Sequence, residues 1–146
     1  MEVTSYRYIE NDHLVVDAFL LEDQSWFLFA YVFEENPSGF VETKWHALQS
    51  KIQSEFTLGK VAGVGGAVKG KITSIPLAYN GPSDVYAKED DLFYLIRTGN
   101  VLNPGLFLDQ KENRQFIRKN FKNSQGKVVN LFSYTGAFSL VCKSLG

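Results

Sequence analysis

The sequence is poor in the residues that would tie it to an oxidising compartment or to a membrane. Its single cysteine, Cys142, cannot form an intramolecular disulfide bond, and this usage fits a reducing compartment. The longest apolar run, 26–33, is far shorter than the roughly 20 residues of a membrane-spanning helix. The first residues also lack the charged-then-apolar order of a signal peptide. We therefore expect a cytoplasmic protein with no membrane association.

The sequence also has little excess of either charge and no recognisable metal-ligand pattern. The formal net charge is −1, so nucleic-acid binding would need a local basic patch rather than an overall positive charge. The two histidines, His13 and His46, stand alone, and no cysteine lies near them at the spacing of a metal site. We expect no bound metal.

Large aromatic side chains are abundant. The 146 residues include 12 Phe, 7 Tyr and 2 Trp, and 45% of the residues are hydrophobic. This composition is sufficient for a buried core and argues against disorder. The length suits one ordinary domain or two small ones.

The first part of the chain predicts a small α+β domain. Segments 13–21 and 26–33 are rich in β-branched and aromatic residues, and the turn residues between them indicate an antiparallel hairpin. Segment 34–39 is typical of a loop. We expect a helix capped by Thr43, because apolar residues then recur at helical spacing on one face: Trp45, Leu48, Ile52 and Phe56.

A glycine-rich stretch, 61–71, resembles a phosphate-binding loop only superficially. Gly65, Gly70 and Lys71 match most of such a motif, but Ile72 stands where Ser or Thr would hold Mg²⁺. An ATP or GTP site therefore stays only a weak third hypothesis, and we expect a flexible loop. Its lysines could face RNA phosphates, although a merely solvated loop explains them equally well; they are Lys60, Lys69 and Lys71.

Break signals divide the chain near its middle. Segment 75–79 is typical of a short extended piece, 80–83 of a turn, and 91–97 of a strand. The sequence thus predicts one domain over 1–85, with a candidate RNA-binding role, and a second over 86–146.

The last 42 residues have their own order of elements. A helical pattern covers 110–121, with Asp109 and Glu112 at the spacing of a capping box. We expect Phe116 and Ile117 on its buried side and a basic exposed side that includes Arg114. Segment 127–132 predicts a buried strand, followed by a turn of small residues and a helix over 137–145. Such a strand, turn and helix places backbone N–H groups where a polar cofactor can bind.

Two segments in this part resemble a known family. Gly-Leu-Phe-Leu-Asp-Gln-Lys-Glu-Asn-Arg (105–114) resembles a Gly-x-Phe-Leu-Asp-Gln-Arg-x-x-Arg signature, and Val-Asn-Leu-Phe-Ser-Tyr-Thr-Gly-Ala-Phe-Ser (129–139) is similar to Leu-Asn-x-Phe-Ser-Tyr-Thr-Gly-x-Phe-Ser. Both belong to a bacterial family of 23S ribosomal RNA methyltransferases. These are class I, S-adenosylmethionine (SAM)-dependent enzymes that include the large-subunit methyltransferases I and K. The resemblance covers 91–146 well and 1–90 weakly.

The resemblance implies a fold, a cofactor and a partner. The fold would be an α+β N-terminal domain, a β-hairpin plus a helix, followed by the truncated start of an α/β Rossmann-like methyltransferase domain. The cofactor would be SAM and the partner ribosomal RNA. The residues implied at the cofactor site are Asn130, Phe132, Ser133, Tyr134, Thr135 and Gly136, with Asp109, Gln110 and Arg114 from the upstream signature. For Asp109 and Arg114, a purely structural role explains the pattern equally well.

The sequence departs from the family most strongly after residue 136. The family's acidic ribose ligand and its Asp-Pro-Pro-type loop have no counterpart in these 146 residues, and no catalytic residue is assigned. We expect an N-terminal fragment that is inactive alone, in which 127–146 is disordered, packs on the N-terminal domain, or pairs with a second copy. The alternative is a non-catalytic RNA- or protein-binding module that carries a remnant of the cofactor motif.

Overall fold

The computed structural model describes residues 4–122, 126–131 and 133–146, and it divides the chain into two compact units. Unit 1 is Met1–Pro104 and unit 2 is Gly105–Gly146. The division falls later than the expected boundary between 85 and 86. The reason is that the hairpin after residue 84 is bonded to unit 1: Leu21 pairs with Ala87, and the Ser5 hydroxyl donates to the Lys88 carbonyl at 2.9 Å.

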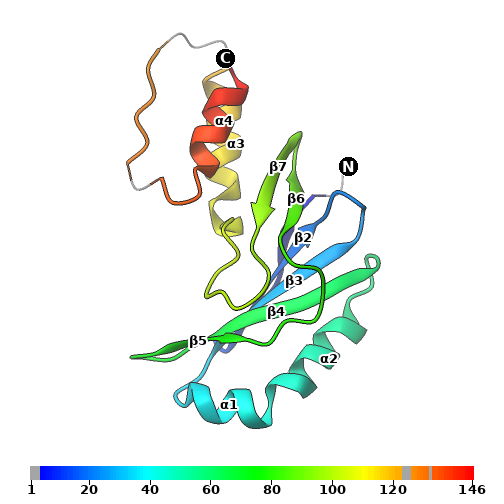
Figure 1. The fold of residues 1–146 in the computed structure, drawn as a ribbon. Coiled ribbons are helices and arrows are strands. Elements are labelled where there is room, and N and C mark those ends of the chain that lie inside the picture. Colours follow the sequence, from blue (N-terminus) through cyan, green and yellow to red (C-terminus); the bar gives the residue numbers. More distant parts are fainter. Residues whose placement is uncertain (1–3, 123–125, 132) are drawn as a thin grey trace. The chain divides into compact units, whose positions relative to one another are not determined.

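Unit 1 is built on a mixed five-stranded sheet (Figure 1). Its strands lie in chain order: β1 (Tyr6–Glu10), β2 (Leu14–Leu20), β3 (Trp26–Phe33), β4 (Val61–Lys69) and β5 (Ser74–Leu77). All neighbours are antiparallel except β3 and β4, which are parallel. The predicted hairpin over 13–33 is confirmed as β2 and β3, and the extended piece at 75–79 as β5. The edge strand β1 was not predicted.

Two helices make the crossover between the parallel strands and cover one face of the sheet (Figure 1). They are α1 (Pro37–Thr43) and α2 (Trp45–Glu55). The buried Trp45, Ile52 and Phe56 pack into the core with the inward side chains of β2, β3 and β4, as the helical spacing predicted. The expected cap at Thr43 is wrong, because Thr43 is the last residue of α1. Asn36 caps α1 instead: its side chain accepts from the Gly39 N–H at 3.1 Å.

The expected flexible loop at 61–71 is also wrong. Residues 61–69 form β4, an interior strand whose middle is fully buried. Its glycines allow backbone to approach where a side chain would not fit. A Cβ on Gly66 would lie 2.2 Å from the Ala30 carbonyl oxygen, and one on Gly63 would lie 2.4 Å from that of Asn80. Glycine here serves close packing rather than mobility.

The opposite face of the sheet is largely apolar but also carries the buried carboxylate of Asp17. Phe19, Phe27 and Phe29 are fully buried there, and the Tyr79 ring packs edge-on against Phe27 at 5.4 Å between ring centroids. A two-stranded sheet, β6 (Val85–Glu89) and β7 (Leu92–Ile96), completes unit 1. The predicted strand at 91–97 is thus confirmed, and its partner β6 confines the turn to Asp90 and Asp91.

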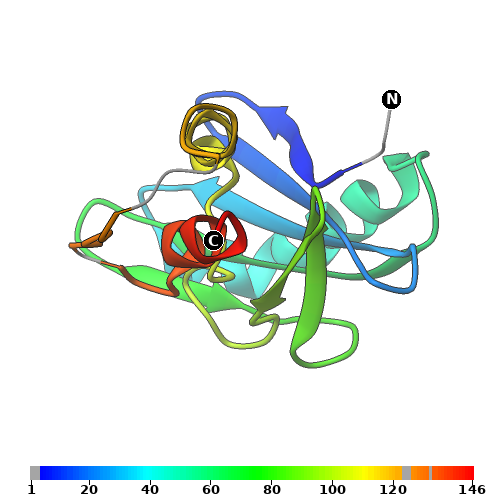
Figure 2. The ribbon, with the colours of Figure 1, turned by 90° about the horizontal axis from the view of Figure 1, so that it is seen from above.

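Unit 2 consists of helices among the residues that the structure describes. A 3-10 helix (Leu108–Gln110) leads into α3 (Lys111–Asn120), and α4 (Ala137–Ser144) packs against α3. Figure 2 views α3 and α4 nearly end-on and side by side. Both helices were predicted. The strand expected at 127–132 is wrong for its described part, since 127–131 has no strand partner and Val128, Val129 and Leu131 are 66%, 79% and 74% exposed. Phe132 lies outside the described residues.

The mixed α/β character expected from the sequence is therefore confirmed, but a Rossmann-like sheet is not. A parallel strand needs neighbours that complete its hydrogen bonds on both sides. The described part of unit 2 provides none for 127–131.

Candidate functional site

The turn that enters α4 has the most unusual backbone in unit 2. Tyr134 and Gly136 both have positive φ, 48° and 78°. The Gly136 N–H donates to the Ser133 carbonyl at 2.7 Å, which closes the turn. Glycine suits this conformation because it lacks a Cβ, and an added Cβ at Gly136 would meet no atom within 4 Å. The turn therefore presents open space directly before the helix.

The N-terminus of α4 has no side-chain cap. Gly136 is the N-cap residue, and the first backbone bond of the helix runs from the Leu140 N–H to the Gly136 carbonyl at 2.9 Å. The N–H groups of the first turn point out of the helix end, where the helix dipole favours a negative charge. A carboxylate or phosphate group is the ligand that such an end accepts.

Three contacts within unit 2 hold this turn in place. The Thr135 hydroxyl donates to the Gly105 carbonyl, which ties the turn to the start of the unit. The Tyr134 ring lies 5.4 Å from that of Phe107, between centroids, and remains 61% exposed. The Asn130 amide donates to the Ser139 hydroxyl at 2.9 Å on the first turn of α4. The two sequence segments of the resemblance therefore contact each other.

Arg114 is not the solvated basic residue that the helical pattern predicted. It is 1% exposed, and its guanidinium carbon lies 5.9 Å from the centre of the Phe138 ring on α4. A cation over an aromatic face is stabilising, more so when it is removed from water. Conversely, Phe116, expected on the buried side of α3, is 60% exposed. Arg114 thus joins α3 to the helix that carries the turn.

The other upstream residues lie at the start of α3. Asp109 is exposed within the 3-10 helix, and the capping box expected for it is absent because Gln110 is the N-cap residue of α3 and makes no side-chain cap bond. The Gln110 side chain accepts from Asn113 at 2.8 Å. Neither residue contacts the turn among the described interactions.

The described part of unit 2 also contains two open hollows. The larger is about 480 Å³ and mainly apolar, and it lies between the ends of α3 and α4, lined by residues that include Ile117, Phe121 and Cys142. The smaller, about 250 Å³, is lined by residues that include Asn130 and Ser139. Cys142 on α4 is half-buried and lines both hollows.

The three candidate RNA-binding lysines do not form one patch. Lys60 and Lys69 stand at opposite ends of β4, roughly 30 Å apart at the rise of a strand. Lys69 donates to the Leu102 carbonyl at 2.9 Å, and burial lowers the pKa of its ammonium group. Lys71 pairs with Glu35 at 3.2 Å, and both side chains are exposed. Each can still meet a phosphate individually, but these three lysines do not form a single basic surface.

Two further classes of site are not found in the described part of the chain. No group of three or more His, Cys, Asp or Glu side chains is arranged to hold a metal ion there. None of the described helices has the length and apolar character needed to cross a membrane.

The likeness of this chain to known proteins lies in its fold. No family model and no curated protein matches the sequence. Among solved structures, a candidate SAM-dependent methyltransferase from Streptococcus mutans matches with a TM-score of 0.67 and 23% identity, over 98% of this chain and 36% of that one. A candidate methyltransferase complexed with S-adenosylhomocysteine (SAH) matches with a TM-score of 0.66, with the same identity and the same shares of each chain.

These likenesses define the fold of the chain. It is a mixed α/β fold that also occurs in structures of candidate methyltransferases. The chain spans little more than a third of the length of the structures it matches.

Proposed function

We propose that this chain is the N-terminal part of a SAM-dependent methyltransferase that acts on RNA, and that the turn 133–136 with the start of α4 is the first half of its cofactor site. The observation that carries the proposal is the positive-φ turn at Gly136, which opens onto an uncapped helix N-terminus. One solved structure of the same fold is described as a candidate SAM-dependent methyltransferase, and another, a candidate methyltransferase, is complexed with SAH.

The residues of the turn fit the amino-acid end of SAM. The carboxylate of its methionine portion would accept from the free N–H groups at the start of α4, where the helix dipole stabilises it. The missing Cβ at Gly136 leaves room for the close approach of the ligand. Ser133 is exposed beside the turn and offers a hydroxyl group. Bound SAM supplies the methyl group, and this chain's residues bind and orient it.

The proposal that RNA, and 23S ribosomal RNA in particular, accepts the methyl group rests on segments 105–114 and 129–139. Their resemblance to the ribosomal RNA methyltransferases is in sequence, and the contact between Thr135 and Gly105 brings the two segments together. A base inside a duplex would have to leave its stack to reach the methyl donor. Catalysis would then depend mainly on holding donor and acceptor in line.

We also propose that the chain is inactive by itself. Nothing in its 146 residues corresponds to the family's acidic ribose ligand or its Asp-Pro-Pro-type loop. A methyl-transfer assay with radiolabelled SAM and ribosomal RNA should show no turnover above background. Turnover by the purified chain would contradict the fragment proposal.

Calorimetric titration with SAM tests the half-site. We expect saturable binding that Gly136→Val weakens roughly tenfold, because a β-branched residue is strained at positive φ and its side chain enters the space left for the ligand. Gly126→Val is the matched control, since an added Cβ there meets nothing within 4 Å. Equal effects of the two substitutions, or no binding by the unchanged chain, would contradict a cofactor site at this turn.

A second function, a non-catalytic RNA- or protein-binding module, has one observation in its favour. Unit 1 is compact with its own hydrophobic core, independent of the candidate cofactor site. Salt-dependent RNA binding without any SAM binding would favour this alternative.

A further inference from the structure

The two-stranded sheet β6–β7 has one buried face and one open face. Ala87, Tyr94 and Ile96 are buried on the inner side. The residues that alternate with them are large and open to solvent: Tyr86 is 50% exposed, Phe93 45% and Leu95 47%. Nothing else in the described part of unit 1 presents two half-exposed aromatic rings on one small sheet. Figure 1 shows this hairpin standing out from the five-stranded sheet.

The register of the hairpin fixes how these side chains are spaced. Tyr86 is directly opposite Leu95, and Lys88 is directly opposite Phe93. Tyr86 and Phe93 are therefore diagonal neighbours on the open face, with about 7–8 Å between their backbones. Successive unstacked bases of a single strand can span this distance, and every base has a π-face that stacks on an aromatic ring.

The charges on the same face suit a phosphate backbone. Lys88 shares the face by its register, and Arg97 continues the alternation just after β7 and is exposed. Glu89, the carboxylate within the strands, is buried on the inner side of the hairpin. Asp84 precedes β6, Asp90 and Asp91 form the turn, and at the edge of β6 the Glu22 N–H donates to the Tyr86 carbonyl at 3.2 Å. The open face itself thus carries aromatic and cationic side chains, and its acidic residues lie around its margin.

A second copy of the chain is a poorer occupant. A stable protein interface buries about 800 Å² on each partner and takes roughly 20–30 residues from each side. The open face offers three apolar side chains on two five-residue strands. That area suits a short nucleotide segment better than a protein surface.

We propose that the open face of β6–β7 binds single-stranded RNA by stacking bases on Tyr86 and Phe93, with Lys88 and Arg97 beside the phosphates. The stacking proposal rests on the proposed function. It adds that the bound RNA is single-stranded and that β6–β7 is the surface that contacts it. An enzyme that modifies a base needs that base unpaired, and a stacking platform holds unpaired RNA.

The test is fluorescence anisotropy with the full chain and a labelled 12-nucleotide oligouridylate in the absence of SAM. We expect Tyr86→Ala/Phe93→Ala to raise the dissociation constant at least tenfold, because stacking on one ring is worth roughly 5- to 150-fold in affinity. Tyr86→Phe/Phe93→Tyr keeps both rings and should bind within about twofold of the unchanged chain. Phe116→Ala removes an exposed ring from α3, away from the hairpin in sequence, and should leave affinity unchanged.

Thermal unfolding by circular dichroism accompanies each variant, so that loss of binding is compared only among folded chains. Equal affinity of the ring-free and ring-retaining variants would overturn the proposal, as would absence of binding by the unchanged chain. A concentration-dependent dimer that the ring-free variant abolishes would also overturn it, because the face would then be a contact between copies. SAM calorimetry is independent of these readouts, so failure of the stacking proposal and failure of the cofactor site are distinguishable.

Discussion

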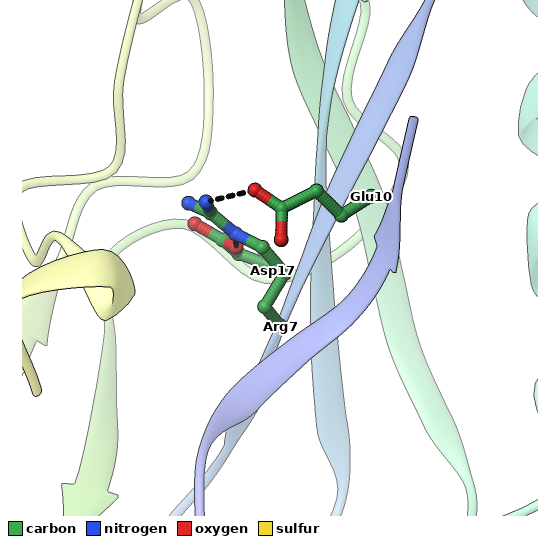
Figure 3. A network of polar contacts seen from close by, with 3 residues as sticks. All are labelled: Arg7, Glu10 and Asp17. Atoms are coloured by element: carbon green, nitrogen blue, oxygen red, sulfur yellow. Dashed lines mark hydrogen bonds and ion pairs between the residues drawn. The ribbon is translucent and has the colours of Figure 1, made fainter. Parts of the chain in front are cut away.

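At the residue scale, the buried carboxylate of Asp17 in unit 1 is stabilised by the guanidinium of Arg7. Asp17 points from β2 into the apolar face of the sheet and is 1% exposed. The Arg7 guanidinium on β1 donates to it at 2.9 Å and to the exposed Glu10 at 3.1 Å (Figure 3). The hydrogen bond with Asp17 raises the pKa of Arg7 above its ordinary value, against the opposing effect of burial. A buried carboxylate needs such a partner, because an isolated charge is costly away from water.

Removing that partner should destabilise the fold. We expect Arg7→Leu to lower the free energy of unfolding by about 2 kcal/mol, somewhat below the cost for a fully buried pair because Arg7 is partly exposed. Glu10→Gln is the control, and it should change stability by less than about 0.5 kcal/mol since its carboxylate is solvated. Urea denaturation measures both. Equal small effects would show that Arg7 does not stabilise Asp17.

Single residues also show where a helical pattern misleads. The sequence assigned Arg114 to a basic exposed side, because charged residues on helices usually face solvent. In the structure it is buried beside Phe138, and Phe116 is exposed instead. A buried cation over an aromatic ring arises from packing between two helices, which no periodicity within one helix reveals.

At the scale of elements, sequence patterns predicted the helices and strands whose conformation depends mainly on their own residues. The alternation in β2 and β3, the apolar stripe of α2 and the helical run of α3 are examples. The missed helix α1 had a recognisable signal in Asn36-Pro37, an N-cap residue followed by a proline in the first turn. The strand β4 was missed for a different reason: its glycines suit a loop in isolation, and only contacts with β3 and with segment 79–98 require them to be small.

The role of these glycines can be measured. We expect Gly66→Ala to destabilise unit 1 by about 3 kcal/mol or more, because the new Cβ would collide with the Ala30 backbone carbonyl on the paired strand. Gly99→Ala is the matched control: its Cβ would lie 3.9 Å from the nearest atom, and we expect a change below about 0.5 kcal/mol. Thermal denaturation of both variants gives the comparison. A tolerated Gly66→Ala would contradict the close packing of β3 and β4.

The segment 127–131 illustrates an element that the sequence favours and the structure lacks. Its valines and leucine have strand propensity, yet they are largely exposed and no strand pairs with them among the described residues. We expect amide hydrogens of 127–131 to exchange at nearly unprotected rates, while those of β3 and β4 exchange many times more slowly. Hydrogen exchange read by mass spectrometry tests this. Strong protection of 127–131 would indicate pairing, for example with a second copy.

At the scale of the whole molecule, the chain consists of two units with separate roles in the proposal. Unit 1 has its own core and carries the open hairpin face, and unit 2 carries the turn at Gly136. The sequence indicated two parts and the order of helices in the second. It could not place the boundary, because the pairing of Leu21 with Ala87 links residues that are far apart in sequence.

The division predicts that unit 1 folds without unit 2. A chain of residues 1–104 should keep the circular dichroism spectrum of a folded α/β protein and unfold cooperatively, because its core cluster comes entirely from its own residues. Loss of cooperative unfolding in this shortened chain would show that unit 2 is needed to complete the core.

Titration of the ¹⁵N-labelled chain with SAH, followed by NMR, tests whether the turn before α4 is the first half of a SAM site. We predict chemical-shift changes concentrated in 133–139, where the backbone N–H groups meet the ligand's carboxylate. Changes concentrated instead in 60–71, or no changes at saturating ligand, would contradict the claim.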